Sequence, residues 1–446
     1  MASRLPGNPG NAALSVAAAA ASFICMYLLS RRFGAGPSAA ILSAVLALSF
    51  ARRRAEGKAH TWQWDLGGII VVGIAAAGVA WLLHTHFVLG AMVFTAGLFV
   101  SVWLRRFGGA WRQLGTVMAL PFIGLLVAPG APHSDGGPGM DLLLVLLAGV
   151  VAFIFDRLLL LLQHPAAAEY GVPKSAEQGA LSTSTRMALQ MGVALAAAFL
   201  CGGLLFPQHW SWVVITAFIV CSGAIGRGDA AYKGVLRLLG ALLGVIAATA
   251  LQYVSVPHGP AVAVLIFGVL FVGVWLRDVS YAWWAACVTV ILALLLPPGD
   301  VPVTALLGER LLAIFVGAVC GVAACWFVLP ITTRSVVRRR LADTLLALEE
   351  LGSATDAERE QKLEAVRRCA LECERIAPPL RWYKRLLGCD EEHPAVWLQL
   401  MQSCTDKLPA KADPELVKAV RLTRKALKDD QGISMALKKV QIVLEA

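Results

Sequence analysis

Long apolar runs separated by short polar connections make up most of the chain. A membrane-spanning helix needs roughly 20 apolar residues, and twelve runs reach or approach this length. The predicted spans are 12–30, 36–50, 66–84, 87–104, 111–129, 140–162, 185–205, 210–226, 233–254, 259–276, 280–297 and 303–329. The first run resembles a signal peptide, but because eleven more follow it we interpret it as an uncleaved helix. The pattern predicts an all-α membrane protein of about twelve transmembrane helices.

The composition supports lipid as the solvent of these helices. Hydrophobic residues are 58% of the chain and charged residues are 15%, whereas soluble domains carry about 25% charged residues. The formal net charge is +10, but the basic residues sit in short connections between apolar runs. This placement is typical of membrane topology, and we expect no nucleic-acid partner.

The distribution of Lys and Arg predicts the orientation. With the N-terminus inside, the cytoplasmic connections hold most of the cations, including Arg52, Arg105, Arg227 and the run that ends at Arg340. Such connections attract Lys and Arg in membrane proteins. Arg31 and its neighbour Arg32 are the exception. We expect a multi-pass protein of a bacterial inner membrane with both termini in the cytoplasm.

The membrane part contains an internal repeat. Leu98-Phe-Val-Ser-Val-Trp-Leu-Arg105 matches Leu270-Phe-Val-Gly-Val-Trp-Leu-Arg277, and the offset is about 170 residues. An apolar run that closes with Pro-Gly follows each copy. We predict two six-helix repeats, parallel because each has an even number of spans, with a substrate path at their interface.

The last part of the chain has a different pattern. It is rich in Leu, Ala and charges of both signs at helical spacing, and one stripe is Leu341, Leu345, Leu348 and Leu351. Prolines punctuate it, so we predict four or five helices in a cytoplasmic bundle with this stripe in its core. The predicted domains are 1–163 and 185–330 for the membrane repeats, 164–184 for a cytoplasmic linker, and 331–446 for the cytoplasmic helical domain.

The second half resembles a known family. The residues that carry the resemblance are Ser184-Thr-Arg186, Gln208-His-Trp210-Ser-Trp212-Val-Val-Ile-Thr216, Gly-Arg227-Gly-Asp229 through Gly240 and Gly244, and Gly308-Glu309-Arg310 through Gly317 and Gly321. They are similar to the fusaric acid resistance family, which includes bacterial aromatic carboxylic acid exporters. A more distant similarity is to plant aluminium-activated malate transporters. The resemblance implies a membrane exporter of organic anions.

The chain departs from the aromatic acid exporters in one respect. Those exporters carry a large soluble insertion between their two halves, whereas residues 163–184 are a short linker here and the soluble part is C-terminal. The Gly pairs Gly240/Gly244 and Gly317/Gly321 are small-xxx-small patterns that allow close helix packing. We interpret them as structural.

Charges within apolar runs mark the candidate site, because an ionisable group in a span costs several kcal/mol unless it is paired or hydrated. The candidate substrate-binding residues are Arg237, Arg310, Arg186, Trp212 and Thr216. An arginine could bind a carboxylate with two parallel hydrogen bonds, and a tryptophan could stack on an aromatic ring. The alternatives are an Arg237 that extends to the interface, an Arg186 that only anchors its helix, and a Trp212 in the interfacial belt.

Three carboxylates are candidates for proton coupling. Glu309 is near the outer start of the last span, and its neighbour Arg310 points about 100° away, so each needs another partner. A structural ion pair is the alternative for Glu309. Asp156 lies in hydrocarbon if its helix runs to Gln163, and at the interface if the helix ends near residue 155, which we favour. The repeat offset places Asp65 opposite Arg237.

Other chemistry has weak support in the sequence. Cys369, Cys373, Cys389 and His393 have a spacing that could hold zinc, but buried structural cysteines are the better interpretation. No P-loop or catalytic triad occurs, so we expect neither an enzyme nor a cofactor. The sequence leaves open a homo-oligomer, and a periplasmic adaptor with an outer-membrane channel.

The leading hypothesis is an efflux transporter for organic anions, in particular aromatic carboxylic acids, driven by protons or the membrane potential. Two alternatives stay open at this point. One is a passive organic-anion channel, and the other is a non-transporting membrane scaffold that acts through its cytoplasmic tail.

Overall fold

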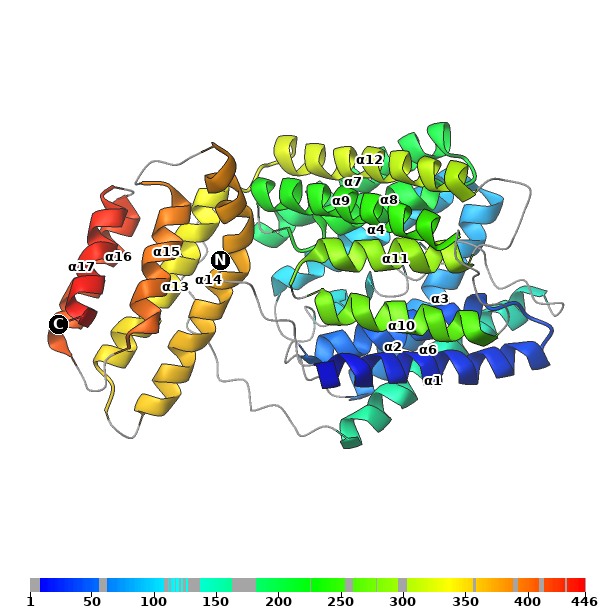
Figure 1. Ribbon diagram of the computed structural model, residues 1–446, viewed down its shortest axis with the longest axis horizontal. Helices are drawn as coiled ribbons and strands as arrows, with labels where there is room; N and C mark the ends of the chain where they lie inside the picture. Colours follow the sequence, from blue (N-terminus) through cyan, green and yellow to red (C-terminus); the bar gives the residue numbers. More distant parts are fainter. Residues whose placement is uncertain are drawn as a thin grey trace. The chain divides into compact units, whose positions relative to one another are not determined.

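A computed structural model describes most of the chain, and every regular element in the part it describes is a helix (Figure 1). The described residues are 9–55, 62–107, 111, 114–116, 118–119, 122, 126, 137–162, 182–224, 226–252, 260–277, 279–295, 303–355, 358–387, 392–408, 413–429 and 431–445. The prediction of an all-helical protein is confirmed for these residues. The predicted span 111–129 and the predicted linker fall largely outside them.

The chain divides into two compact units. The first, which we call the membrane unit, comprises residues 1–166, 183–222 and 233–329, and the second, the tail unit, comprises 167–182, 223–232 and 330–446. The first predicted repeat belongs to the membrane unit, and so does the second except for residues 223–232 and 330. Their parallel relation and the cytoplasmic place of the tail stay predictions.

The helices outside the tail bundle coincide with eleven of the twelve predicted runs. They are α1 (Pro9–Arg32), α2 (Ser38–Ala55), α3 (Trp62–Thr85), α4 (Phe87–Leu104), the 3-10 turn η1 (Arg105–Phe107), α6 (Gly137–Leu162), α7 (Thr183–Leu205), α8 (Trp210–Cys221), α9 (Arg227–Gln252), α10 (Pro260–Leu276), α11 (Tyr281–Leu295) and α12 (Val303–Phe327). Six of them, α1, α4, α6, α7, α9 and α12, are long and apolar enough to cross a membrane. In the other five helices the apolar segment is shorter, as with Ser38–Ala51 in α2 and Gly73–Thr85 in α3, so the count of twelve spans stays a prediction.

Two helix boundaries differ from the predicted spans. The span predicted at 210–226 ends as α8 at Cys221, because Gly223 takes a left-handed conformation with φ of 62°. Only glycine adopts that backbone without strain. The helix α9 then begins at Arg227, so Arg227 and Lys233 lie in its first turns and not in a connection.

Helices of the membrane unit approach one another closely. The α8–α12, α7–α8 and α7–α12 pairs are in contact, α4 packs on α7, and α1 packs on α2, α6 and α10. A Cβ atom added to Gly317 of α12 would lie 2.3 Å from the carbonyl oxygen of Val213 in α8, and one added to Gly240 of α9 would lie 2.3 Å from that of Ala282 in α11. The glycines were predicted to serve packing, and these distances confirm it.

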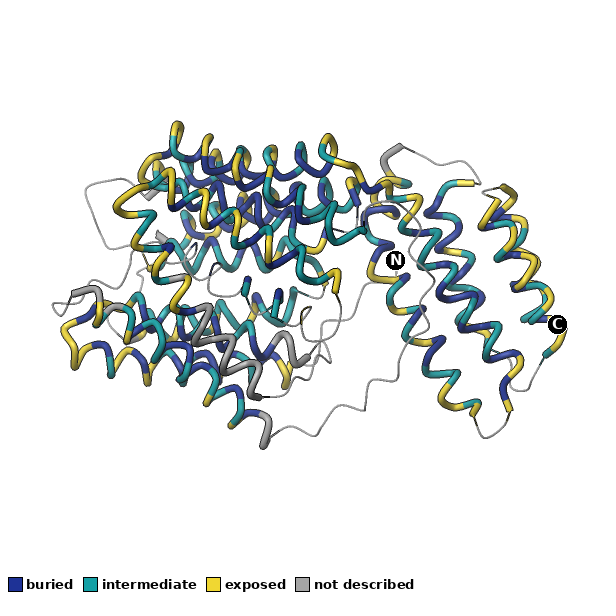
Figure 2. Tube along the Cα trace, turned by 180° about the vertical axis from the view of Figure 1, so that it is seen from behind, coloured by how far each residue is buried: buried dark blue, intermediate teal, exposed yellow. Residues whose placement is uncertain are grey.

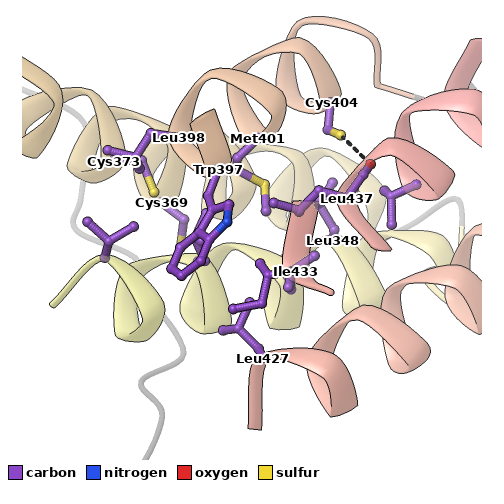
Figure 3. Packing of buried hydrophobic residues seen from close by; sticks show 14 of the residues in the cluster. Leu348, Cys369, Cys373, Trp397, Leu398, Met401, Cys404, Leu427, Ile433 and Leu437 are labelled. Carbon is purple, nitrogen blue, oxygen red and sulfur yellow. Dashed lines mark hydrogen bonds between the residues drawn. The ribbon is translucent and has the colours of Figure 1, made fainter. Parts of the chain in front are cut away.

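The tail unit contains a five-helix bundle among its described residues. Its helices are α13 (Thr333–Gly352), α14 (Arg359–Leu387), α15 (Pro394–Asp406), α16 (Pro414–Asp429) and α17 (Ile433–Glu445). The predicted stripe of Leu341, Leu345, Leu348 and Leu351 is wholly buried in its core. Figure 3 shows the Trp397 ring within this core, among residues of several helices.

Not every proline of the tail marks a helix end. Pro378 and Pro379 are among the prolines that punctuate the tail sequence, but both lie inside α14. A proline costs a helix one backbone hydrogen bond and a steric clash. Here α14 also contributes Cys369, Cys373 and Ile376 to the bundle core, and this packing holds the helix through the interruption. Pro394 and Pro414, in contrast, begin α15 and α16.

Candidate functional site

Two arginines are buried in the membrane unit. Arg237 of α9 is 3% exposed and Arg310 of α12 is 4% exposed. Neither forms an ion pair with a carboxylate among the residues that the structure describes. The Nη1 of Arg237 lies 3.4 Å from the hydroxyl of Tyr281 at the start of α11. A buried charge without a counter-charge is costly, so these two side chains are the most unusual feature of the unit.

Several donors of these arginines have no acceptor. The Nε of Arg237, and both the Nε and the Nη1 of Arg310, are buried and lack a hydrogen-bond partner within the described structure. The two guanidinium groups are also within electrostatic range of each other. The pair therefore presents two positive charges and several unused N–H groups inside the membrane unit.

An aromatic group stands beside Arg310. The guanidinium carbon lies 5.1 Å from the ring centre of Trp212, which is on the first turn of α8. A cation over an aromatic face is stabilised by the ring quadrupole. The ring of His209 stacks on Trp212 with a centroid distance of 4.2 Å and an interplanar angle of 16°. Trp212 thus contacts both a fixed cation and a titratable imidazole.

The carboxylate of Glu309 contacts the same histidine. The Nδ1 of His209 lies 3.0 Å from the Oε1 of Glu309, and their side chains are 26% and 38% exposed. Glu309 and Arg310 are neighbours on α12 and bond to different groups, as the sequence predicted. The cluster therefore joins a partly exposed His–Glu pair to a buried arginine through one tryptophan.

Close helix packing sets this geometry. Gly317 lets α12 approach the backbone of α8 at Val213, one residue beyond Trp212. Gly321 packs against Val220 of the same helix. Because α12 is held against α8 at these two points, the Arg310 side chain reaches Trp212 and the Glu309 side chain reaches His209.

The structure places two of the five residues predicted to bind substrate in direct contact, namely Arg310 and Trp212. Arg237 is within electrostatic range of Arg310. Thr216 is wholly buried, and its hydroxyl donates a hydrogen bond of 2.8 Å to the carbonyl of Trp212 in its own helix. Arg186 lies on the first turn of α7, with no described contact to the other four.

The predicted proton-coupling residues fall at separate places. Glu309 lies in the cluster, as described. Asp156 is 8% exposed and α6 continues to Leu162, so the interfacial helix end that we favoured is wrong. Its neighbour Arg157 lies with its guanidinium 4.8 Å from the Phe153 ring centre. Asp65 is on α3, and its side chain lies outside the described residues.

Sequence reasoning missed His209 and Tyr281. His209 immediately precedes the predicted span 210–226, so it did not count among the charges within apolar runs. Its contact with Glu309 joins residues 100 positions apart. No local pattern reports such a contact. Tyr281 was interpreted only as the edge of a span.

The cysteines of the weakly predicted zinc site lie in a different setting. Burial, followed by the nearby Asp343 carboxylate, raises the pKa of Cys369 to about 12. Burial also raises the pKa of Cys373 to about 11. Zinc binds the thiolate form of cysteine, and a raised pKa disfavours that form. His393 caps α15, with its Nδ1 3.1 Å from the amide nitrogen of Ala395, and Cys389 lies outside the described residues. The described residues contain no group of three metal ligands.

The long apolar helices and the buried cations define a multi-pass helical membrane protein. The model of the fusaric acid resistance protein-like family matches residues 193–324, and so confirms the resemblance seen in the sequence. This segment contains His209, Trp212, Arg237, Glu309 and Arg310. Curated protein sequences gave no match to the chain. The family implies membrane transport as the general function.

Proposed function

We propose that this protein exports organic anions, in particular aromatic carboxylic acids, across the bacterial inner membrane. The observation that carries the proposal is the pair Arg237 and Arg310, both buried and both without a carboxylate partner in the described structure. Keeping two unpaired charges inside a membrane unit is expensive. An anionic substrate removes this cost when it binds, so the site favours anions over neutral molecules.

The shape of the cluster favours an aromatic carboxylate. Arg310 has two unused donor nitrogens, Nε and Nη1, and a guanidinium binds a carboxylate with parallel, charge-assisted hydrogen bonds. The Trp212 ring beside it offers an apolar face to the body of the substrate. Arg237 and the Tyr281 hydroxyl provide further donors. A ring with one carboxylate and a hydrogen-bonding substituent satisfies these groups together.

Glu309 and His209 supply the proposed proton coupling. Their side chains are partly exposed, so they can exchange protons with water, and Glu309 is adjacent to Arg310 on α12. A proton added to this pair changes the net charge next to the substrate site. Coupling by this route requires that the carboxylate of Glu309 titrates during transport, which its amide equivalent cannot do.

The test is efflux of labelled hydroxybenzoate from cells with and without the protein, before and after a protonophore. The proposal expects faster efflux that the protonophore stops. Efflux that survives the protonophore would instead support a passive channel. The absence of any effect across a panel of aromatic acids would contradict the substrate class and favour the scaffold, whose function would depend on residues 334–446.

Substitutions locate the site. Arg310→Gln removes the charge that faces Trp212 and is expected to reduce efflux by roughly tenfold or more, as loss of one charged hydrogen-bonding partner costs about 1.5–3 kcal/mol. Arg310→Lys keeps the charge without the planar fork and should retain part of the activity. The matched control is Arg106→Gln, because Arg106 packs on Trp103 and Phe107, away from the cluster. Glu309→Gln should abolish the dependence on the proton gradient.

A further inference from the structure

Two helices form an outer layer of the tail unit. The helix α16 packs on α13 and α17, and α17 packs on α15 and α16. Their inward residues are core members, namely Leu416, Val420, Leu427, Ile433, Leu437 and Val440. One stripe of each helix therefore faces away from the core, which Figure 2 shows as exposed positions along both helices.

This outward surface is basic and contains large apolar side chains. Its exposed cations are Lys418, Arg421, Lys425, Lys428, Lys438 and Lys439. Among them lie Leu422, Met435 and Ile442, which are 59%, 66% and 63% exposed. The exposed acids Glu415, Asp429 and Glu445 stand at helix ends. We call the six cations and three apolar residues the basic face.

A second exposed leucine, on α14, has acidic residues beside it as well as arginines. Leu371 of α14 is 56% exposed and is flanked by Arg367 and Arg375. There, however, Arg375 donates to Glu372 at 2.7 Å, and the next acid, Glu374, is also exposed. On the basic face, Lys418 and Lys425 form no ion pair with a described residue. Arg421 is bonded to Glu349, whereas the positive charges of Lys418 and Lys425 are available to an external partner.

We propose that the basic face docks on an anionic bilayer surface. Cations that alternate with large apolar side chains suit such a surface, because the cations meet anionic headgroups while the apolar groups enter the boundary of the acyl region. A second copy of the same face is a poor partner, since it would place cations against cations. The charge pattern thus selects a lipid surface over self-association.

The connection to the last apolar helix favours this docking. Only five residues separate the end of α12 at Phe327 from the start of α13 at Thr333. A tether of this length keeps the bundle at a high effective concentration near the bilayer. Arg338, near the start of α13, donates to the carbonyl of Leu427 at 2.5 Å. The end of α16 therefore lies at the end of the bundle where the chain enters from α12.

The experiment uses the full-length protein in lipid nanodiscs, with an environment-sensitive fluorescent amino acid in place of Leu422. Discs of phosphatidylcholine alone are compared with discs that also contain phosphatidylglycerol. The proposal expects a blue shift, and roughly twofold quenching by brominated lipid, only in the anionic discs. High salt should reverse both, because it screens the headgroup charge. The same probe in place of Leu371 is the control and should not respond.

Charge reversal tests the cause of the signal. Lys418→Glu combined with Lys425→Glu should abolish the response at position 422, whereas Arg367→Glu combined with Arg375→Glu should leave it unchanged. Lys418→Gln with Lys425→Gln is a milder pair that should weaken the response without placing acids side by side. Circular dichroism of each variant reports whether the bundle is folded.

Three outcomes would overturn the proposal. They are an equal response in neutral discs, no response in anionic discs, and a response that depends on protein concentration in detergent. The last would identify a second copy as the partner. A response that requires added acidic protein would count as no response to lipid. None of these readouts depends on transport, so failure here would leave the proposed exporter function untouched.

Discussion

The helices within the membrane unit and the helices within the tail unit pack through different kinds of side chain. In the membrane unit, Gly240 and Gly317 let backbones meet directly, and an added Cβ would lie 2.3 Å from a carbonyl oxygen at both positions. In the tail unit, the helices are spaced by large side chains such as Leu341, Leu348 and Trp397, all fully buried. Direct backbone contact at glycines is thus a feature of these membrane-unit interfaces, whereas large side chains fill the core of the bundle.

The difference follows from the two solvents. In water, burial of apolar surface drives helices together, so large side chains stabilise the bundle most. In lipid, the tails are as apolar as leucine, and helix association depends on close van der Waals packing and polar contacts. Exposed apolar residues are accordingly common in the membrane unit, as with Leu204 and Phe327, at 73% and 83%.

Charge is handled differently as well. In the tail unit, Glu349 accepts hydrogen bonds from both Arg421 and Arg424. In the described part of the membrane unit, the partner of Arg310 is the Trp212 ring and that of Arg237 is the Tyr281 hydroxyl. The tail carboxylate is thus neutralised by two cations, whereas the two buried arginines face no carboxylate among the described residues. We infer that the unneutralised arginines are retained for a ligand.

The largest expected effect comes from Trp397→Ala. This residue is 0% exposed, and its Nε1 lies 3.2 Å from the Oε2 of Glu392. Removing a buried aromatic side chain from a core costs about 3–5 kcal/mol. Urea unfolding of the full chain in nanodiscs, followed by circular dichroism, should show the bundle transition at much lower urea. Trp382→Ala is the control, because Trp382 is 39% exposed. Equal losses of stability in the two variants would contradict the claim that burial of large side chains stabilises the bundle.

A smaller effect is expected from one methyl group at a close helix contact. Gly317→Ala forces α8 and α12 apart or displaces the Val213 carbonyl, and overpacking of this kind costs about 1–3 kcal/mol. In α12 itself, Gly308→Ala meets nothing within 4 Å and should be neutral or slightly stabilising. In the tail unit, the Cβ of Gly352→Ala meets a side-chain atom, Val417 Cγ2, at 2.9 Å, and the nearest backbone atom across the contact is 3.5 Å away.

The three alanine variants are compared by thermal unfolding in detergent. The expected order of destabilisation is Gly317→Ala first, then Gly352→Ala, then Gly308→Ala. If Gly352→Ala were the most harmful, backbone contact would not distinguish the membrane unit from the bundle. Loss of efflux in Gly317→Ala alone, with normal unfolding, would show that the α8–α12 contact serves the site more than the fold.

The helices were predictable because apolar runs and amphipathic stripes are local properties of the sequence. The buried stripe that begins at Leu341 could be found from its spacing alone. Three features could not. The end of α8 depends on the backbone conformation at Gly223. The first turns of α9 contain polar residues from Arg227 onward, so they do not belong to an apolar run. The continuation of α14 through Pro378 depends on packing against the bundle core.

The site was partly predictable for a similar reason. Arg237 and Arg310 are conspicuous because each interrupts an apolar run, and the cost of burying a charge makes such a residue a functional candidate. The partners were not predictable. His209 meets Glu309 across 100 residues, and the hydroxyl of Thr216 is used within its own helix. Contacts between helices depend on tertiary packing, which no short pattern contains.

The smallest expected effect is at Glu349, and it depends on pH. Burial raises the pKa of this carboxyl, but the hydrogen bonds from Arg421 and Arg424 and their positive charges outweigh it, so the pKa is lowered overall. A carboxyl with a lowered pKa in the folded state contributes stability above its unfolded pKa of about 4.3, and this contribution is lost as the pH falls through the folded value. We expect Glu349→Gln to cost about 1 kcal/mol at neutral pH, since both arginines are partly exposed and their hydrogen bonds are weakened by water.

The measurement is bundle stability between pH 7 and pH 3 for the original chain and for Glu349→Gln. The variant should be less stable at pH 7, and the difference should shrink as the pH drops below about 4, because protonation of Glu349 makes the two proteins alike. The control is Glu350→Gln, where a single lysine, Lys362, lies 2.8 Å away on the surface. Such a pair contributes little, so its profile should follow the original chain. Parallel stability profiles for all three proteins would mean that the contacts of Glu349 with two arginines do not stabilise the fold. The contrast with Arg237 and Arg310, which have no carboxylate partner in the described structure, would then not reflect a difference in stability.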